Sequence, residues 1–221
     1  MVRSPRLRKQ WELYDEQEYQ RAFEEARALL VRLHGPDRRD AYRLVGLACH
    51  QQKQYSQATF WLRKACEGSD DAGDWLNLSL AATMQGNHEL GAEAFEQVRI
   101  CQQVARYGQH PGFYLQLYWY ACALYDKAAY ERLQSLLDEL ADVYRRLHRT
   151  ETTFLYARRL PFLSSVLILA MRHFAEQEKR AEGVAWLHAL GEKLDEEGQR
   201  QVNQAILDLM AGDEQPHTGN E

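Results

Sequence analysis

Proline and glycine are scarce in this chain, at 5 and 13 of 221 residues. A sandwich of many short strands needs more of both at its turns, so that fold class is excluded. Long apolar runs are missing too: a run such as Val166 to Met171 is far shorter than the roughly 20 residues that a membrane span needs. The dominant residues are Ala, Leu, Glu, Gln and Arg, which lose least on entering a helix. The composition therefore predicts an all-α protein.

Motifs of catalysis and of metal binding are also missing. The stretch from His88 begins like HExxH, but Ala92 stands where the second zinc-binding histidine belongs. No GxGxxG, phosphate-binding loop or GxSxG motif occurs. No CxxC pair occurs among the four cysteines, Cys49, Cys66, Cys101 and Cys122. We therefore expect no enzyme activity, no metal and no cofactor.

Charge and cysteine usage bear on partners and compartment. The net charge of −5 repels a phosphate backbone, which disfavours nucleic acid as a partner. No apolar stretch follows the basic residues at the start of the chain, so we expect no secretory signal. The cysteines are widely scattered, which together with the missing signal predicts a cytoplasmic protein, although the sequence leaves a disulfide between two of them open.

Two adjacent segments repeat a pattern of apolar and small residues. The first has its landmarks at Tyr42, Val45, Gly46, Cys49, Tyr55, Ala58, Leu62 and Ala65. The second has them, each 33 residues later, at Trp75, Leu78, Ser79, Ala82, His88, Gly91, Phe95 and Val98. Within each segment two small residues lie 12 apart, Gly46 with Ala58 and Ser79 with Gly91. Antiparallel helices need small residues where their backbones cross, so the pattern predicts stacked helix hairpins.

This pattern resembles the W-x2-L-G-x2-Y…A-x3-F pattern of the tetratricopeptide repeat (TPR) superfamily, whose period is about 34 residues. The resemblance is clearest over residues 39–105. It is looser over 113–145, where Ala121 and Leu133 keep the 12-residue interval but Leu133 replaces a small residue. It implies a right-handed α-solenoid of antiparallel hairpins. We treat residues 1–212 as one such domain and 213–221 as a disordered tail.

The flanking segments are predicted to bring the total to ten or eleven helices. Ser4 and Pro5 form an N-cap and first-turn pair at the start. Residues 99–113 contain a helix stop and a loop. The later predicted helices cover 161–177, 181–194 and 196–210. The first two of these should cross near Ala170 and Gly183.

In TPR proteins the first helix of each hairpin lines a concave groove that holds a peptide. The residues that match those positions are Arg43, Leu44, Leu47, His50, Leu76, Asn77, Leu80, Met84, Tyr118, Trp119, Cys122 and Tyr125. Some members clamp the acidic C-terminus of heat-shock chaperones with lysine and asparagine. Arg43 and Asn77 resemble two clamp members, but Leu47 and Trp119 do not fit the others. The resemblance therefore implies an apolar and aromatic groove rather than a carboxylate clamp.

An apolar groove suits an amphipathic helix or an extended segment. The predicted function is a non-enzymatic scaffold or adaptor that binds another protein or peptide, with a chaperone as the narrower version. We expect no membrane partner and leave a homo-oligomer open. Two alternatives also stay open: the chain's own helix at 196–210 covers the groove, or the protein is a ligand-sensing regulatory domain.

One basic segment supplies a further alternative. Its cations are Arg145, Arg146, His148, Arg149, Arg158 and Arg159, against one acid, Glu151. The arginines that precede residue 150 complement the negative end of a long helix, which is the interpretation that we favour. A dock for an acidic partner segment, or a helical-repeat surface for nucleic acid, is the alternative.

Overall fold

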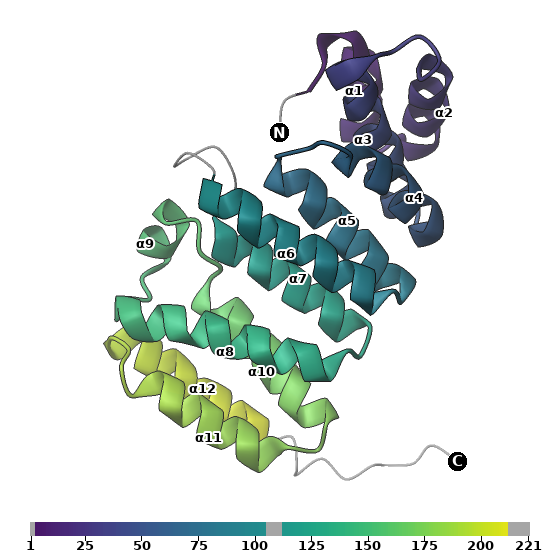
Figure 1. Ribbon diagram of the computed structural model, residues 1–221. Helices are drawn as coiled ribbons and strands as arrows, with labels where there is room; N and C mark the ends of the chain where they lie inside the picture. Colours follow the sequence, from purple (N-terminus) through teal and green to yellow (C-terminus); the bar gives the residue numbers. More distant parts are fainter. Residues whose placement is uncertain (1–2, 105–111, 212–221) are drawn as a thin grey trace, which may run out of the picture. The chain divides into compact units, whose positions relative to one another are not determined.

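The structure is a computed structural model that describes residues 3–104 and 112–211 (Figure 1). Within these ranges the chain forms twelve α-helices, one 3-10 helix and no strand, so the all-α prediction is confirmed. None of these helices is both long and apolar enough to cross a membrane. The predicted tail at 213–221, and residues 105–111 of the predicted loop at 99–113, lie outside the described residues.

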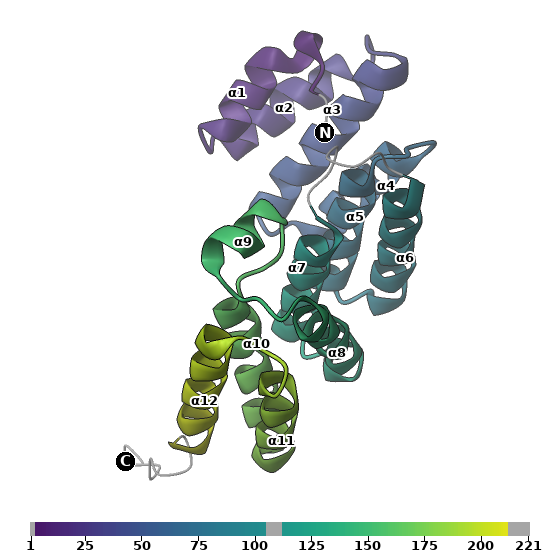
Figure 2. The same cartoon turned by 90° about the vertical axis from the view of Figure 1, so that its left-hand side faces the viewer.

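The chain forms two compact units, Met1–His110 and Pro111–Glu221, where the sequence analysis treats 1–212 as one domain. The elements of unit 1 are η1 (Pro5–Leu7), α1 (Arg8–Asp15), α2 (Tyr19–Leu29), α3 (Gly35–Gln51), α4 (Tyr55–Cys66), α5 (Ala72–Gln85) and α6 (His88–Val104). Each helix of this unit packs on the next one along the chain, and α3 also contacts α1 and α5 (Figures 1 and 2). Unit 1 is therefore a run of consecutive helix hairpins.

Local signals set the helix ends in unit 1. The Ser4 hydroxyl accepts a hydrogen bond from the Arg6 backbone N–H at 3.2 Å, and Pro5 opens η1, so the predicted starting pair is confirmed. Asp71 caps α5 by accepting from the Gly73 N–H at 2.7 Å. Gly86, at φ 92°, ends the same helix in the left-handed conformation that favours glycine.

Small residues lie at the helix crossings as the 12-residue spacing predicts. Gly46 is buried, and a Cβ added to it would lie 2.6 Å from Cγ of Leu62 on α4. The Ser79 hydroxyl donates to the Gly91 carbonyl oxygen at 2.7 Å, which joins α5 to α6. Apolar residues on both sides of these crossings form the core; the fully buried ones include Leu44, Val45, Ala58, Leu62, Ala81 and Val98.

Unit 2 contains α7 (Phe113–Asp126), α8 (Tyr130–Leu147), α9 (Thr152–Ala157), α10 (Leu163–Glu176), α11 (Arg180–Gly191) and α12 (Glu196–Ala211). α10 packs on α7, α8, α11 and α12, so it is the central helix of the unit (Figure 1). Ala170 and Gly183 are buried, and a Cβ on Gly183 would lie 2.8 Å from Cβ of Phe174. The predicted crossing of these two helices is therefore confirmed.

The connection from α8 to α10 contains a helix that the sequence analysis did not predict. α9 has only six residues, too few to show a helical period. The segment before it is fixed by Asp195, whose carboxylate accepts from the Thr150 N–H at 2.8 Å and from its hydroxyl at 2.5 Å. Asp195 also accepts from the Gly198 N–H at 2.9 Å, in the first turn of α12. One side chain thus caps α12 and holds the α8–α9 connection.

Candidate functional site

The predicted groove residues of unit 1 fall into two sets. Those that the structure leaves partly exposed are Leu47 and His50 on α3 and Asn77, Leu80 and Met84 on α5. We call these five residues the α3–α5 face. The other three, Arg43, Leu44 and Leu76, are at most 5% exposed. These three side chains are part of the interior of the folded chain, so we do not include them in the face.

Arg43 is buried because two carboxylates enclose its guanidinium. Its Nη1 donates to Asp40 Oδ1 at 2.7 Å, its Nη2 donates to Asp74 Oδ2 at 2.8 Å, and its Nε donates to Asp74 Oδ1. Burial opposes the charge of Arg43, but its hydrogen bonds to Asp74 and the two negative charges outweigh burial and raise its pKa above the usual value. This arginine is therefore committed to α3 and α5 and cannot clamp a partner's carboxylate.

The network extends from Arg43 to the start of the chain. Asp40 Oδ2 accepts from the Ser4 backbone N–H at 2.7 Å and from Trp11 Nε1 at 2.9 Å. Asp74 Oδ2 accepts from the Ser69 hydroxyl at 2.6 Å. Six donor atoms on four residues, Ser4, Trp11, Arg43 and Ser69, thus hydrogen-bond to two buried carboxylates, which joins η1 and α1 to α3 and α5.

Two polar side chains on the α3–α5 face differ from Arg43 in having no partner. His50 Nε2 and Asn77 Nδ2 are shielded from solvent and make no hydrogen bond to any described residue. The ring of His50 lies edge-on to that of Tyr55, at 5.4 Å between centroids. Burial lowers the pKa of His50, so this imidazole is neutral at pH 7. The face therefore holds unsatisfied polar atoms among apolar side chains.

The predicted groove residues of unit 2 lie on α7. Trp119 is 39% exposed, whereas Tyr118, Cys122 and Tyr125 are half-buried. The Tyr125 hydroxyl donates to Glu176, near the end of α10. Burial, together with a hydrogen bond to Cys122, raises the pKa of Tyr118 to about 12. The neighbouring helix on this side is α10. The helix that the open alternative places over the groove, α12, packs on α10 and α11.

The basic segment is paired within the chain. Arg145 Nη1 donates to Asp142 at 2.9 Å, and Arg149 Nη2 donates to Glu151 at 3.4 Å. The guanidinium groups of Arg149 and Arg158 lie 4.8 Å and 5.4 Å from the ring centroid of Phe154. Arg145 and Arg146 lie in the last turn of α8, as the interpretation based on the helix dipole expects, and Arg159 lies beyond α9. The segment thus offers no row of unpaired arginines.

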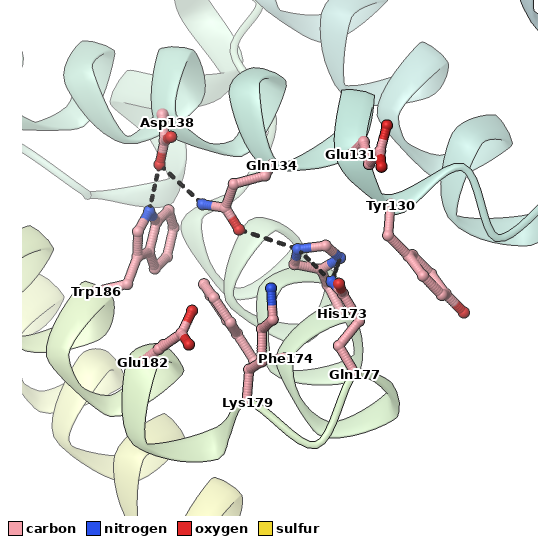
Figure 3. A pocket seen from close by; sticks show the side chains of 10 residues that line it. All are labelled: Tyr130, Glu131, Gln134, Asp138, His173, Phe174, Gln177, Lys179, Glu182 and Trp186. Atoms are coloured by element: carbon pink, nitrogen blue, oxygen red, sulfur yellow. Dashed lines mark hydrogen bonds between the residues drawn. The ribbon is translucent and has the colours of Figure 1, made fainter.

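A cavity that sequence analysis did not find lies among α8, α10 and α11 (Figure 3). Its volume is about 390 Å³, in the range of small-ligand sites. Its lining residues are Tyr130, Glu131, Gln134, Asp138, His173, Phe174, Gln177, Lys179, Glu182 and Trp186. These residues span 57 positions of the sequence, from 130 to 186, and each is ordinary for a helix surface. No motif signals the site, because only helix packing brings the residues together.

A chain of hydrogen bonds fixes one wall of this cavity (Figure 3). Asp138 Oδ1 accepts from Trp186 Nε1 at 2.7 Å and from Gln134 Nε2 at 3.1 Å. The Oε1 atom of Gln134 lies 2.9 Å from Nε2 of His173, and the amide nitrogen of Gln177 lies 3.1 Å from Nδ1 of the same ring. Burial, with the nearby charge of Lys179, lowers the pKa of His173. A neutral ring that donates from Nε2 to Gln134 and accepts from Gln177 at Nδ1 satisfies these two contacts.

Among the described residues, no three His, Cys, Asp or Glu side chains are placed to hold a metal ion. The four cysteines are thiols, and burial raises the pKa of Cys49 to about 11, which disfavours a reactive thiolate. The chain matches no protein-family model, and no curated protein or solved structure gives a significant match.

Proposed function

We propose that this protein is a TPR-like right-handed α-solenoid and a non-enzymatic scaffold or adaptor that binds another polypeptide. The repeat pattern at 39–105 and the consecutive hairpins of unit 1 support this proposal. The binding surface is the α3–α5 face in unit 1, with Trp119 and its neighbours on α7 as a surface of unit 2. The narrower form is a chaperone that holds an apolar segment of its substrate.

The unsatisfied atoms on the α3–α5 face carry the proposal. An unpaired buried polar group costs about 1–3 kcal/mol, and native proteins keep few of them. His50 Nε2 and Asn77 Nδ2 are two such atoms on the face that the repeat pattern assigns to the groove. Backbone groups of an extended or helical partner segment would satisfy both. Leu80 and Met84 supply apolar contact area on the same face.

The burial of Arg43 narrows the class of partner that we expect on the α3–α5 face. With the guanidinium engaged by Asp40 and Asp74, the α3–α5 face contains an amide and a neutral imidazole but no charged group. Such a face suits the uncharged backbone and apolar side chains of a partner. A partner's terminal carboxylate would find no cation on it.

Affinity capture with the full chain as bait tests the proposal. Leu80→Arg should abolish the capture of a specific polypeptide, since a charge then enters the apolar contact. Gln57→Arg is the matched control, because Gln57 is exposed on α4 and lies outside the α3–α5 face. Asn77→Ala adds a stricter criterion: it should weaken capture without lowering the melting temperature, because the side chain makes no hydrogen bond in the free chain.

The proposal fails if every polypeptide retained by the wild type is retained equally by the Leu80→Arg and Asn77→Ala variants. It also fails if Asn77→Ala destabilises the chain as strongly as it weakens capture, since the amide would then serve folding. Light scattering of the purified chain shows whether the captured partner is a second copy.

A further inference from the structure

We propose that the cavity among α8, α10 and α11 binds an organic cation, an alkylammonium or guanidinium group. This is a second site, separate from the α3–α5 face. It lies entirely in unit 2, whereas the residues varied in the capture test lie in unit 1. The two proposals can therefore fail independently.

The lining of the cavity is acidic. Glu131, Asp138 and Glu182 supply three carboxylates, and Lys179 supplies one positive charge. His173 adds no charge, because its hydrogen bonds and its burial favour the neutral ring. The lining thus has a formal charge of −2 at pH 7, counted as three acids less one lysine.

Most oxygens of these carboxylates accept no hydrogen bond from the described residues. Asp138 accepts both of its hydrogen bonds on Oδ1, which leaves Oδ2 without a donor from any described residue. Glu131 and Glu182 take part in no hydrogen bond or ion pair with described residues. Charged acceptors that line a cavity and have no internal donor suit a ligand with N–H groups.

Aromatic rings form the rest of the site. Phe174 and Trp186 lie with their centroids 6.0 Å apart, and Tyr130 contacts the ring of His173 at 5.5 Å. A cation within about 6 Å of such a ring is attracted by its negative face, most strongly for tryptophan. The indole N–H of Trp186 donates to Asp138, so this ring and this carboxylate lie side by side at the cavity (Figure 3).

The arrangement favours an organic cation over a metal ion. The described residues contain no group of three donors close enough for a metal, and these carboxylates come from α8 and α11 on different walls of the cavity. A volume of about 390 Å³ accommodates several non-hydrogen atoms beyond a single ion. The ligand class is therefore an amine or guanidine with a short carbon chain.

The indole N–H of Trp186 is the reporter for the test. Its NMR resonance in the full-length protein is assigned by its loss in Trp186→Phe, and the protein is titrated with agmatine and with n-butylammonium. We expect a saturable shift of this resonance with both probes and none with n-butanol, which has the same carbon chain without the charge. Equal shifts with butanol, or no shift with either cation at tens of millimolar, would overturn the proposal.

Charge-neutral variants then locate the contact. Glu182→Gln should weaken agmatine binding by about threefold or more, the effect of losing one partly exposed ion pair. Glu192→Gln, directly after the end of the same helix, is the matched control, because Glu192 is exposed and does not line the cavity. Lys179→Met should strengthen binding, since it removes the competing cation. Unchanged affinity in both Glu182→Gln and Lys179→Met contradicts the site.

A final titration separates the two sources of such a cation. N-acetyl-arginine methylamide presents the guanidinium as a side chain within a peptide, whereas agmatine presents it as a free metabolite would. Comparable affinities support the side chain of a polypeptide partner, and binding of agmatine alone supports a small free amine. Failure of both compounds to shift the Trp186 resonance overturns the site for either source.

Discussion

Arg43→Met tests whether the buried network around Arg43 holds unit 1 together. The substitution removes the guanidinium and leaves two carboxylates inside, Asp40 at 3% and Asp74 at 0% exposure. Removing one partner of a buried ion pair typically costs about 3–5 kcal/mol. Asp40 keeps the donors from Ser4 and Trp11, and Asp74 keeps the hydroxyl of Ser69. Neither acid therefore loses every hydrogen bond. We therefore expect the lower end of that range, about 3 kcal/mol.

The assay is urea unfolding of the full chain at pH 7, with the free energy of unfolding extrapolated to water. Arg39→Met is the matched control, one helical turn earlier on α3, where the arginine is half-buried and makes no ion pair with a described residue. It should cost less than about 0.5 kcal/mol. The indole N–H of Trp11 should also shift in the Arg43→Met variant alone, because Asp40 relaxes toward it.

The result that refutes this reasoning is an Arg43→Met variant whose stability lies within about 0.5 kcal/mol of the wild type. Such a value is typical of an exposed surface ion pair. Arg43 would then be available to a partner, as the clamp comparison in the sequence analysis supposes.

Two further predictions concern packing and pH. Gly46→Leu should lower the free energy of unfolding by about 1–3 kcal/mol in the same urea assay, because even a Cβ there would lie 2.6 Å from Leu62. The control Gln57→Leu, on the exposed side of α4, should leave the free energy of unfolding unchanged. The folded state depresses the pKa of His173, so below about pH 6.5 the unfolded chain binds a proton that the folded chain resists, and stability falls as pH falls from 7.5 to 5.5. His173→Gln should flatten this dependence, whereas an unchanged slope would show that the ring takes up its proton freely.

The repeat pattern predicted the parts of the fold that depend on local sequence. Gly46, Ser79 and Gly183 are small because helices cross there, and a small residue at a fixed interval is visible in one dimension. α9 was missed because six residues cannot show a period. The division into two units was missed as well, because it depends on contacts between helices rather than on the composition of any segment.

The candidate sites were harder to predict than the fold. Position in a repeat does not tell whether a side chain is buried between helices or exposed, and the sequence therefore did not reveal that Arg43 and Leu76 are buried. The cavity in unit 2 takes its residues from three helices with no shared motif. Glu182 and Trp186 are separated by one helical turn, but Asp138 lies 48 positions before that tryptophan, and only the structure shows that they meet.

Burial alone does not distinguish a structural polar residue from one that awaits a partner. Arg43 and Asn77 both looked like clamp residues in the sequence, and both have polar atoms shielded from water. The difference lies in hydrogen bonding: the guanidinium of Arg43 donates to the carboxylates of Asp40 and Asp74 within the chain. Asn77 Nδ2 and His50 Nε2 are buried and have no hydrogen-bond partner among the described residues, which costs free energy of folding. Hydrogen bonds to a partner's backbone would remove this cost. Substitution of Arg43 should therefore lower the free energy of unfolding, whereas substitution of Asn77 should weaken partner binding and leave the free energy of unfolding unchanged.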